Sequence, residues 1–355
     1  MSEFRMLTSA EQVAEYLRAE MATGRLRGVM PGVLRLEAEL GINRKTVETA
    51  LRLLEVEGLL VPQGAGRRRL IRLPEHLASP SLRVAILLGE PSDLRLDYQV
   101  AIRHELVEAG QDAVYAPKSM VELGMDVKRI ARMVKKTAAD AWVVTAGSHA
   151  VLEWFIAQGE PAFALFGHRR GLPIAGVGPN KLPAITAATQ ALVGLGHRRI
   201  VMLARPRRRL PVPGAGEQAF LDELAACGIE PGPYHLPEWE ETVDGFNGRL
   251  EALFRLTPPT ALIVDEAAFF TAALQFCAIR GIRVPHDVSL ICTDADPTFA
   301  WCKPSVAHIS WDSRPVVRRI VRWAANVSRG EVDVRQTLTP ADFVVGGTIG
   351  PAGGG

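Results

Sequence analysis

With 355 residues, 48% of them hydrophobic and 23% charged, the chain has the composition of a folded protein with a sizeable core. It contains no run of about 20 uncharged apolar residues and begins without the apolar segment of a secretion signal, which excludes a membrane span and favours the cytoplasm. The net charge of +2 lies wholly in residues 1–75, with 12 basic and 10 acidic side chains against 29 of each in the remainder, a modest indication of nucleic-acid binding.

The N-terminal residues predict two short helices before position 42. The segment Thr8-Ser9-Ala10-Glu11-Gln12 contains two overlapping capping boxes, which indicate a helix start, and Gly24 indicates its end. A second helix follows the turn Met30-Pro31-Gly32 and ends at Gly41. This helix carries three leucines, Leu34, Leu36 and Leu40.

A third helix and a hairpin complete this region. Asn43 is a suitable N-cap and Gly58 a suitable end, and the apolar spacing between them predicts one buried stripe. The stripe consists of Val47, Ala50, Leu51 and Leu54. Two short apolar strands, 59–61 and 69–71, flank a basic turn. Three helices followed by a basic hairpin predict a winged helix-turn-helix.

The same residues resemble the GntR-type winged helix, over nearly all of positions 9–72. The match includes Met30-Pro31-Gly32 and the run Leu36-Glu37-Ala38-Glu39-Leu40-Gly41-Ile42-Asn43-Arg44-Lys45-Thr46-Val47, and it ends at Gly64-x-Gly66. The resemblance implies that the third helix enters the major groove and that the wing tip reaches the minor groove. The DNA-binding residues expected from it are Arg35, Asn43, Arg44, Lys45, Thr46, Glu48, Thr49, Gly64, Gly66, Arg67 and Arg68.

Two positions depart from that family pattern. Leu34 stands where the family usually has an arginine, with Arg35 beside it. Glu48 stands where the family favours an arginine. Its carboxylate can accept from a cytosine amino group or pair with Arg44 one helical turn earlier, and the sequence leaves both roles open.

Residues 73–81 contain two prolines and no periodicity, and they predict a linker. From residue 82 to 350, strands that are apolar on both faces alternate with amphipathic helices, which indicates an α/β fold with parallel sheets. Two Rossmann-like lobes fit this length better than one, and residues 351–355 predict a flexible tail. The expected strands are 84–88, 113–115, 142–145, 163–166, 200–203, 261–264 and 288–292; the expected helices lie near 96–109, 126–137, 149–158, 181–195, 215–227, 244–255, 266–281 and 312–328.

This second region resembles the sensor domain of LacI-type regulators, which is built like a periplasmic binding protein. The resemblance rests on Gly194-Leu195-Gly196-His197-Arg198-Arg199-Ile200, on Pro259-Thr260-Ala261-Leu262-Ile263-Val264-Asp265, and most specifically on the run from Gly281 to Ile291. It implies two lobes that close on a small molecule. A GntR-type head on a LacI-type sensor is the arrangement of the arabinose-repressor group.

In such folds the ligand lies beyond the carboxyl ends of the strands. These ends are 89–93, 146–149, 168–170, 205–209, 265–266 and 294–296. The expected effector-binding residues are Asp265, Asp294, Arg205 and Ser148, although Asp294 can alternatively cap the next turn. The arginines at 205 and 207–209 favour an anionic effector, although a run of charges in a loop is more often only solvated. The family resemblance favours a sugar or a sugar derivative such as a sugar acid.

Together these features predict a transcriptional regulator, a repressor that is not an enzyme. Its expected partners are a double-stranded DNA operator, a carbohydrate or sugar-acid effector and a second copy in a homodimer. The alternative is an α/β enzyme or a small-molecule binding protein with an N-terminal domain that does not bind DNA. No complete dinucleotide, phosphate-loop or nucleophile-elbow motif supports an enzyme, and we expect no metal or cofactor. The cysteines lack metal spacing and predict free thiols: Cys227, Cys277, Cys292 and Cys302.

Overall fold

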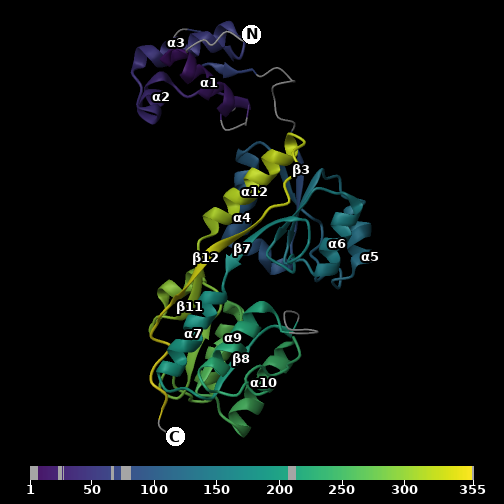
Figure 1. Cartoon of the computed structure of the whole chain (residues 1–355), viewed down its shortest axis with the longest axis vertical. Helices are drawn as coiled ribbons and strands as arrows, with labels where there is room; N and C mark the ends of the chain where they lie inside the picture. The colour runs from purple at the N-terminus through teal and green to yellow at the C-terminus, as the bar shows by residue number, and fades with distance from the viewer. Residues whose placement is uncertain are drawn as a thin grey trace. The chain divides into compact units, whose positions relative to one another are not determined.

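The computed structural model of the chain describes residues 7–22, 26, 28–64, 68–72, 81–206 and 213–353. The chain divides into two compact units, Met1–Gly178 with Ser313–Thr337, and Pro179–Asp312 with Leu338–Gly355. The first unit contains an N-terminal domain, here called the head, and an α/β domain, here called lobe 1 (Figure 1). The second unit is lobe 2. In the described ranges no helix has the length and apolar character to cross a bilayer.

The head contains the three predicted helices and a small antiparallel sheet. Its elements are α1 (Ser9–Ala22), α2 (Val33–Leu40), α3 (Arg44–Val56), β1 (Leu60–Val61) and β2 (Leu70–Ile71). The predicted capping box at Thr8 is formed, because its backbone N–H donates to Glu11 Oε2 over 2.8 Å and its hydroxyl oxygen accepts from the Glu11 N–H over 3.3 Å. Asn43 Oδ1 caps α3 by accepting from the backbone N–H of Thr46 over 2.9 Å.

The core of the head lies between α1 and α3. The predicted stripe of α3 is fully buried there, against α1 and the leucine Leu36 of α2. Leu34, one of the three leucines of α2, is 71% exposed because it projects from the opposite face of that short helix.

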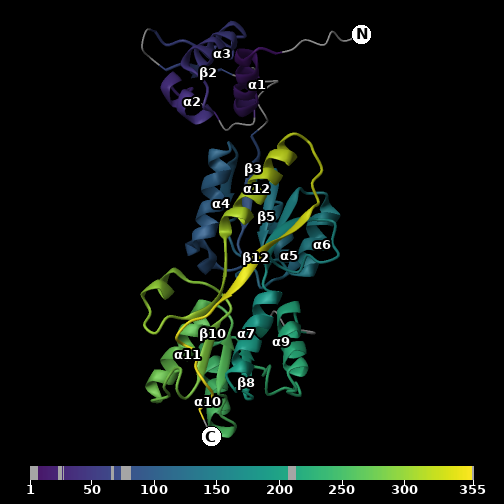
Figure 2. The same ribbon diagram turned by 60° about the vertical axis from the view of Figure 1, so that its left-hand side comes forward.

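Lobe 1 is a parallel five-stranded sheet in the order β4-β3-β5-β6-β7. Figures 1 and 2 show α4 and α12 side by side on one face and α5 and α6 on the other. Apolar strand residues are therefore buried on both faces, as the sequence predicted. The elements are β3 (Arg83–Leu87), η1 (Pro91–Arg95), α4 (Asp97–Glu108), β4 (Asp112–Tyr115), α5 (Val127–Val134), β5 (Ala141–Thr145), α6 (His149–Gln158), β6 (Ala162–Leu165), β7 (Ala175–Asn180) and α12 (Ser313–Ser328).

Lobe 2 has strand order β8-β9-β10-β11-β12, parallel except for β12, which runs antiparallel to β11. One face carries α7 and α9, and the other carries α10 and α11, each over its own apolar cluster. The elements are α7 (Leu182–Gly194), β8 (Ile200–Leu203), α9 (Ala215–Ala226), α10 (Val243–Leu256), β9 (Ala261–Val264), α11 (Ala267–Ile279), β10 (Ser289–Cys292), η2 (Pro297–Trp301), β11 (Ala307–Trp311) and β12 (Gln336–Val344).

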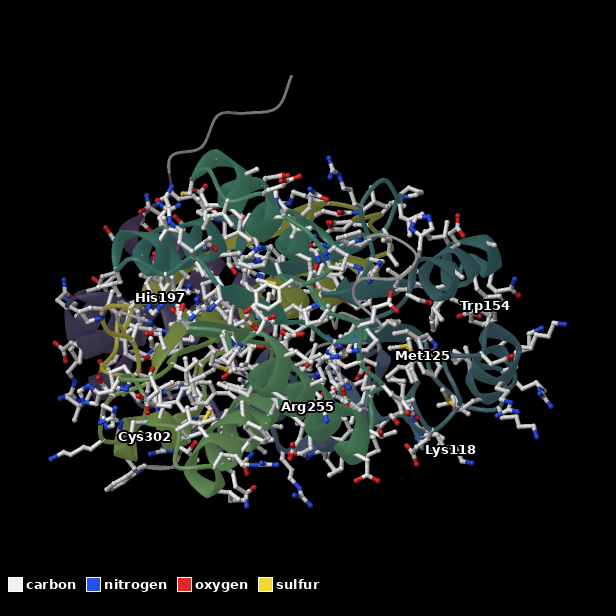
Figure 3. The ribbon with its side chains drawn as sticks, turned by 90° about the horizontal axis from the view of Figure 1, so that it is seen from below. Lys118, Met125, Trp154, His197, Arg255 and Cys302 are labelled. Carbon is white, nitrogen blue, oxygen red and sulfur yellow. The ribbon has the colours of Figure 1, made fainter. Side chains whose placement is uncertain are left out.

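Several side chains outside the strands complete the two lobe cores. Met125 and Trp154, labelled in Figure 3, pack as partly buried side chains against the core of lobe 1. In lobe 2 the buried His197 donates from Nε2 to the carbonyl oxygen of Gly350 over 2.9 Å. The backbone N–H of Ala352 donates to the Leu195 carbonyl over 2.8 Å. These contacts hold the last described residues of the chain against the end of α7.

The sequence missed three strands. β7 has the sequence Ala-Gly-Val-Gly-Pro-Asn, whose glycines and proline are typical of turns. β12 contains a proline and alternates exposed with buried positions, and β11 is only partly buried. β11 and β12 lack the continuous apolar run by which the other strands were found, because they are not buried on both faces.

Candidate functional site

The exposed face of α3 carries a stripe of polar and basic side chains. Lys45, Thr49 and Arg52 are exposed and stand at positions i, i+4 and i+7, so they lie on one face of the helix. The buried stripe of α3 faces α1 instead. The Thr49 hydroxyl donates to the Lys45 carbonyl over 2.9 Å, which fixes its orientation. Sequence reasoning did not include Arg52, although its spacing from Lys45 was a sufficient signal.

Arg44, at the first position of α3, forms an ion pair with Glu48. Its Nε donates to Glu48 Oε1 over 2.9 Å, and both side chains are at least one-third exposed. The hydrogen bond and charge of Glu48 raise the pKa of Arg44, and the same hydrogen bond lowers the pKa of Glu48. Of the two roles that the sequence left open for Glu48, the structure of the free protein contains the pairing with Arg44.

Other basic residues of the head are similarly paired. Arg35 Nε donates to Glu39 Oε1 over 2.7 Å within α2, and Arg18 makes several hydrogen bonds to the carboxylate of Glu57. Exposed pairs of this kind contribute little to stability because both partners are well solvated. They also reduce the positive potential of the head. Lys45 and Arg52, which have no ion-pair partner among the described residues, are therefore the main basic groups on the exposed face of α3.

The other predicted DNA-binding residues lie at the start of α3 and in the wing. Asn43 and Thr46 form the N-cap of α3. The hydroxyl of Thr46 also donates to Oδ1 of Asn43 over 3.0 Å. In the wing, Gly64 has a positive φ of 111°, which favours glycine, and Arg68 is exposed. Gly66 and Arg67 lie outside the described residues.

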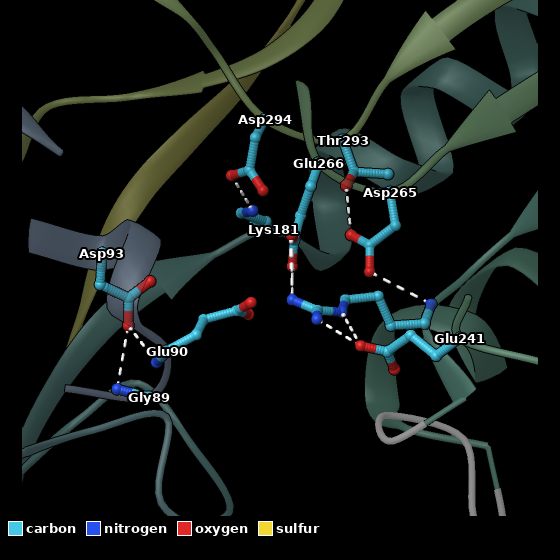
Figure 4. A network of polar contacts seen from close by, with 10 residues as sticks. Gly89, Glu90, Asp93, Lys181, Glu241, Asp265, Glu266, Thr293 and Asp294 are labelled. Atoms are coloured by element: carbon cyan, nitrogen blue, oxygen red, sulfur yellow. Dashed lines mark hydrogen bonds and ion pairs between the residues drawn. The ribbon is translucent and has the colours of Figure 1, made fainter. Parts of the chain in front are cut away.

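A cluster of charged side chains lies where three strands of lobe 2 end. The last residues of β8, β9 and β10 pair in register, so the residues that follow these strands meet at one edge of the sheet. These residues are Arg205, Asp265, Glu266, Thr293 and Asp294. The sequence predicted this edge as a binding site, and the paired strand ends bring these five residues to it. Figure 4 labels Asp265, Glu266, Thr293 and Asp294.

Arg205 is the centre of this cluster. Its guanidinium donates to Glu266 over 3.0 and 3.1 Å and to Glu241 over 3.1 Å, and a second hydrogen bond joins it to Glu241 (Figure 4). It also lies over the ring of Phe269, 5.5 Å from the centroid. Two carboxylates therefore surround this buried cation. The sequence-based argument that Arg205 favours an anionic effector is thus weakened, and residues 207–209 lie outside the described part.

Asp265 connects the three strand ends. Its Oδ1 accepts from the hydroxyl of Thr293 over 2.7 Å, and its Oδ2 accepts from the backbone N–H of Arg205 over 3.4 Å. The side chain is buried. A buried carboxylate requires such donors because leaving it unpaired is costly. Asp265 therefore orients Arg205 and Thr293 in addition to any contact with a ligand.

Asp294 forms an ion pair with Lys181, the residue just before α7. Both side chains are about one-quarter exposed, so the pair is reachable from solvent. The capping role considered for Asp294 belongs to its neighbour Asp296, which accepts from the backbone N–H of Thr298 over 2.8 Å at the start of η2. No local pattern in the sequence pointed to Lys181, because its partner is 113 residues away.

Strand ends in lobe 1 also carry predicted site residues. Asp93 Oδ2 accepts from the backbone N–H groups of Gly89 and Glu90 over 2.9 and 3.0 Å, which closes the loop after β3 (Figure 4). Ser148 is the N-cap of α6, and its hydroxyl oxygen accepts from the N–H of Val151 over 3.4 Å. Among the described residues, this hydroxyl donates no hydrogen bond.

The backbone is strained at the same strand ends. Ala146 after β5, Phe166 after β6 and Glu266 after β9 have φ values of 55°, 60° and 59°, which non-glycine residues rarely adopt. Such conformations persist where the surrounding structure holds them, often at ligand-binding loops. Their shared location at the carboxyl ends of the strands favours this edge of each sheet as the functional one.

Comparisons with known proteins match both parts of the chain. Residues 9–66 match the model of bacterial regulatory proteins of the gntR family, and residues 189–349 match that of the periplasmic binding protein-like domain. The transcriptional repressor CytR of Escherichia coli (strain K12) is 27% identical over 132 residues, 37% of this chain and 38% of the relative. The regulator CelR of Thermobifida fusca is 27% identical over 146 residues, 41% of this chain and 42% of the relative. The chain thus spans about two-fifths of these curated relatives.

Solved structures share the fold. The lac repressor dimer bound to operator and an anti-inducer has a TM-score of 0.61 at 18% identity, covering 79% of this chain and 99% of the repressor chain. The CelR–cellobiose complex has a TM-score of 0.62 at 18% identity, covering 90% of this chain and 100% of the CelR chain. The predicted α/β architecture of a winged helix and a two-lobed binding-protein fold is confirmed.

Proposed function

We propose that this chain, in which a gntR-type winged helix is joined to a periplasmic binding protein-like domain, is a transcriptional repressor that responds to a small molecule. The observation that carries the proposal is the exposed stripe Lys45, Thr49 and Arg52 on α3, together with Arg44 at its N-terminal end. A helix that buries one stripe in a small domain and presents basic and hydroxyl groups on the other is suited to the major groove.

Each side chain has a distinct role in this proposal. Arg44, Lys45 and Thr49 read base edges at the N-terminal part of α3, and Glu48 either releases Arg44 or accepts from a cytosine amino group. Arg52, farther along the helix, contacts phosphate. Further contacts come from Arg35, Asn43 and Thr46 and from the wing residues Gly64, Gly66, Arg67 and Arg68.

The effector is a carbohydrate or a sugar derivative bound at the strand ends of the sensor. CelR, a neighbour in fold, has been solved with cellobiose, and this supports a sugar-like ligand. In lobe 2 the exposed edge of the Lys181–Asp294 pair and the Arg205 cluster offer both donors and acceptors to hydroxyl groups. Asp265 orients Thr293 and Arg205 by accepting hydrogen bonds from them. In lobe 1, Ser148 offers a hydroxyl group.

The regulator acts in the cytoplasm as a homodimer on two-fold operators, and it is not an enzyme. The curated relatives above are named as transcriptional regulators. Within the described residues, the carboxylates of the lobe 2 cluster are tied to Arg205, Lys181 and Thr293, an arrangement suited to holding a ligand. In this proposal residues 1–72 bind DNA, 73–81 form a linker, 82–350 bind the effector and 351–355 form a tail.

The test is selection of a duplex from a random library by the full-length protein, followed by fluorescence anisotropy at several salt concentrations. We expect selective binding that weakens steeply with salt, since phosphate contacts release counterions. Lys45→Ala should reduce affinity, whereas Arg129→Ala, an exposed basic residue on α5 of lobe 1, is the matched control and should not. Enrichment of no sequence by the wild-type protein contradicts the proposal.

A further inference from the structure

Arg169 lies in the loop that follows β6 in lobe 1, and its side chain turns back along β7. Phe166 and Gly167 reverse the chain with φ values of 60° and 70°. The guanidinium Nη1 then donates to the carbonyl oxygen of Phe166 over 3.1 Å. Arg169 is thereby held at the carboxyl edge of the sheet, where ligands bind in parallel α/β folds.

Two glycines of β7 make room for this side chain. A Cβ atom on Gly176 would lie 2.5 Å from Cδ of Arg169 and 3.0 Å from its Nε. A Cβ atom on Gly178 would lie 3.3 Å from both Nη1 and Nη2. The guanidinium therefore extends along the backbone of β7 in a slot that any larger residue at these positions would narrow.

The charge of Arg169 has no counterion in the described part of the chain, where no carboxylate lies within ion-pair distance of it. Burial lowers its pKa, which is the effect of removing a cation from water without an anion to replace it. Two other arginines, buried among the described residues, are instead neutralised by carboxylates. Arg205 pairs with Glu241 and Glu266, and Arg319 pairs with Asp333 over 2.8 and 3.0 Å.

An unneutralised cation that is partly withdrawn from water destabilises the folded protein, so buried charges are normally paired. One of the five N–H groups of the Arg169 guanidinium donates to a carbonyl oxygen. The remaining N–H groups lie in one plane and match the spacing of two oxygens of a carboxylate or phosphate. An anionic ligand would supply the missing counter-charge. This is the property expected of a binding residue and not of a structural one.

The surroundings of Arg169 belong to a ligand-binding edge. The backbone N–H of His168 donates to the Gly147 carbonyl over 2.9 Å, so the loop that carries Arg169 packs on the loop that carries Ser148. Nδ1 of His149, at the start of α6, lies 3.2 Å from the carbonyl oxygen of His168. The N-terminus of α6 thus opens on the same edge, and helix N-termini favour anions.

We infer that Arg169 binds the carboxylate or phosphate group of an anionic effector at the carboxyl edge of lobe 1. The inference rests on the proposed function, because the anion is taken to belong to the effector. It moves the anion-binding role from Arg205, whose charge is balanced by two glutamates, to Arg169, which has no carboxylate partner among the described residues.

The test is thermal unfolding and calorimetric titration of the full-length protein with defined probes at constant ionic strength. The probes are inorganic phosphate, gluconate, glucose 6-phosphate and neutral glucose, with chloride as the salt control. We expect at least one oxyanion probe to raise the unfolding temperature, since a ligand of the folded state stabilises it by mass action. Gluconate and glucose 6-phosphate distinguish a carboxylate from a phosphate.

Three variants separate a binding role from a structural one. Arg169→Gln should weaken oxyanion binding by about ten- to a hundredfold, the loss expected for charge-assisted hydrogen bonds. Arg170→Gln removes the adjacent, exposed arginine and should bind like the wild type. Gly178→Ala keeps Arg169 but crowds its guanidinium, and it should weaken oxyanion binding. Without a probe, Gly178→Ala should unfold near the wild-type temperature and Arg169→Gln at or above it, because the second variant removes an unneutralised charge.

The inference fails if no oxyanion stabilises the wild type, or if Arg169→Gln responds to the oxyanions as the wild type does. Stabilisation by glucose alone that is unchanged in Arg169→Gln also overturns it. DNA selection distinguishes this failure from that of the proposed function. Selective DNA binding without an oxyanion response supports the proposed regulator and contradicts the anion site. An Arg169-dependent oxyanion response without selective DNA binding supports the anion site and contradicts the proposed regulator.

Discussion

The ammonium group of Lys181 forms an ion pair with the carboxylate of Asp294, although 113 residues separate them in the chain. Lys181 precedes α7 and Asp294 follows β10, so the pair joins two elements of lobe 2 at the edge where its strands end. Both side chains stay partly exposed. The same edge holds Asp265 and Arg205. In the proposed function, the charges at this edge select the effector.

The first prediction concerns the two aspartates of this edge. Asp294→Ala should weaken effector binding about ten- to a hundredfold while operator affinity without effector stays near wild type, because the DNA contacts lie in the head. Asp265→Ala should do the same and also lower the free energy of unfolding by about 1–3 kcal/mol, since it leaves buried donors without an acceptor. Titration of effector into the variant–operator complex and denaturant unfolding measure the two effects.

Thr293→Val is the control for Asp265. It removes the hydroxyl that donates to Asp265 while keeping the shape of the side chain, so it separates the support of the carboxylate from its contact with a ligand. A normal effector midpoint in both aspartate variants would place the binding site elsewhere.

The second prediction concerns Arg44. Arg44→Ala should cost about 1–3 kcal/mol of operator binding and relax sequence preference, as expected for a side chain that reads a base edge. Glu48→Gln should raise non-specific DNA affinity, because it releases Arg44 from its pair and removes a negative charge from α3. Fluorescence anisotropy with operator and scrambled duplexes measures both. Unchanged operator affinity in Arg44→Ala would exclude base contact by this residue.

The third prediction concerns the wing. Arg67→Ala and the exposed Arg68→Ala should weaken binding to operator and scrambled DNA alike and reduce the slope of log affinity against log salt by about 1 each. The physical reason is that a phosphate contact releases counterions without reading sequence. If the salt dependence of DNA affinity is unchanged in both variants, the wing does not contact DNA phosphates.

The fourth prediction concerns the dimer. Trp301 at the end of η2 and Ile279 at the end of α11 are large apolar side chains of lobe 2 that are 90% and 76% exposed. We expect the wild-type protein to sediment as a homodimer and Trp301→Ser to weaken the dimer about tenfold or more, as truncation of an interface aromatic does. A wild-type monomer both free and on DNA is the contradicting result.

The fifth prediction concerns pH. Burial lowers the pKa of His197, so this side chain is neutral in the folded protein, where it contacts Ser289 and Gly350. Below pH about 6.5 the unfolded chain binds the proton more readily than the folded one, so the free energy of unfolding falls as the pH decreases from 7.5 to 5.5.

His197→Asn tests this assignment. It should lose about 1–3 kcal/mol at pH 7.5 through the missing hydrogen bonds, and its stability should depend less on pH over that range. Denaturant unfolding at both pH values gives the comparison. An equal pH dependence in the two proteins assigns the effect to other groups.

The sequence by itself determined the local architecture. The capping box at Thr8, the N-cap Asn43 and the buried stripe of α3 were predicted residue by residue, because each depends on neighbours within one or two helical turns. The doubly buried strands of both lobes were found for a related reason. A continuous apolar run is a local property, whereas β7, β11 and β12 lack one and were missed.

Only the tertiary structure decided which charges meet. Arg205 was predicted to face an anion, but its neighbours are Glu241 and Glu266, from a loop and a strand end that are far away in sequence. The sequence placed Arg169 only within the strand end 168–170. The room for its side chain beside two glycines of β7, and the lack of a carboxylate partner among the described residues, are tertiary features. The preference of a site depends on the sum of charges that the fold brings within a few ångströms, and that sum is not a local property of the sequence.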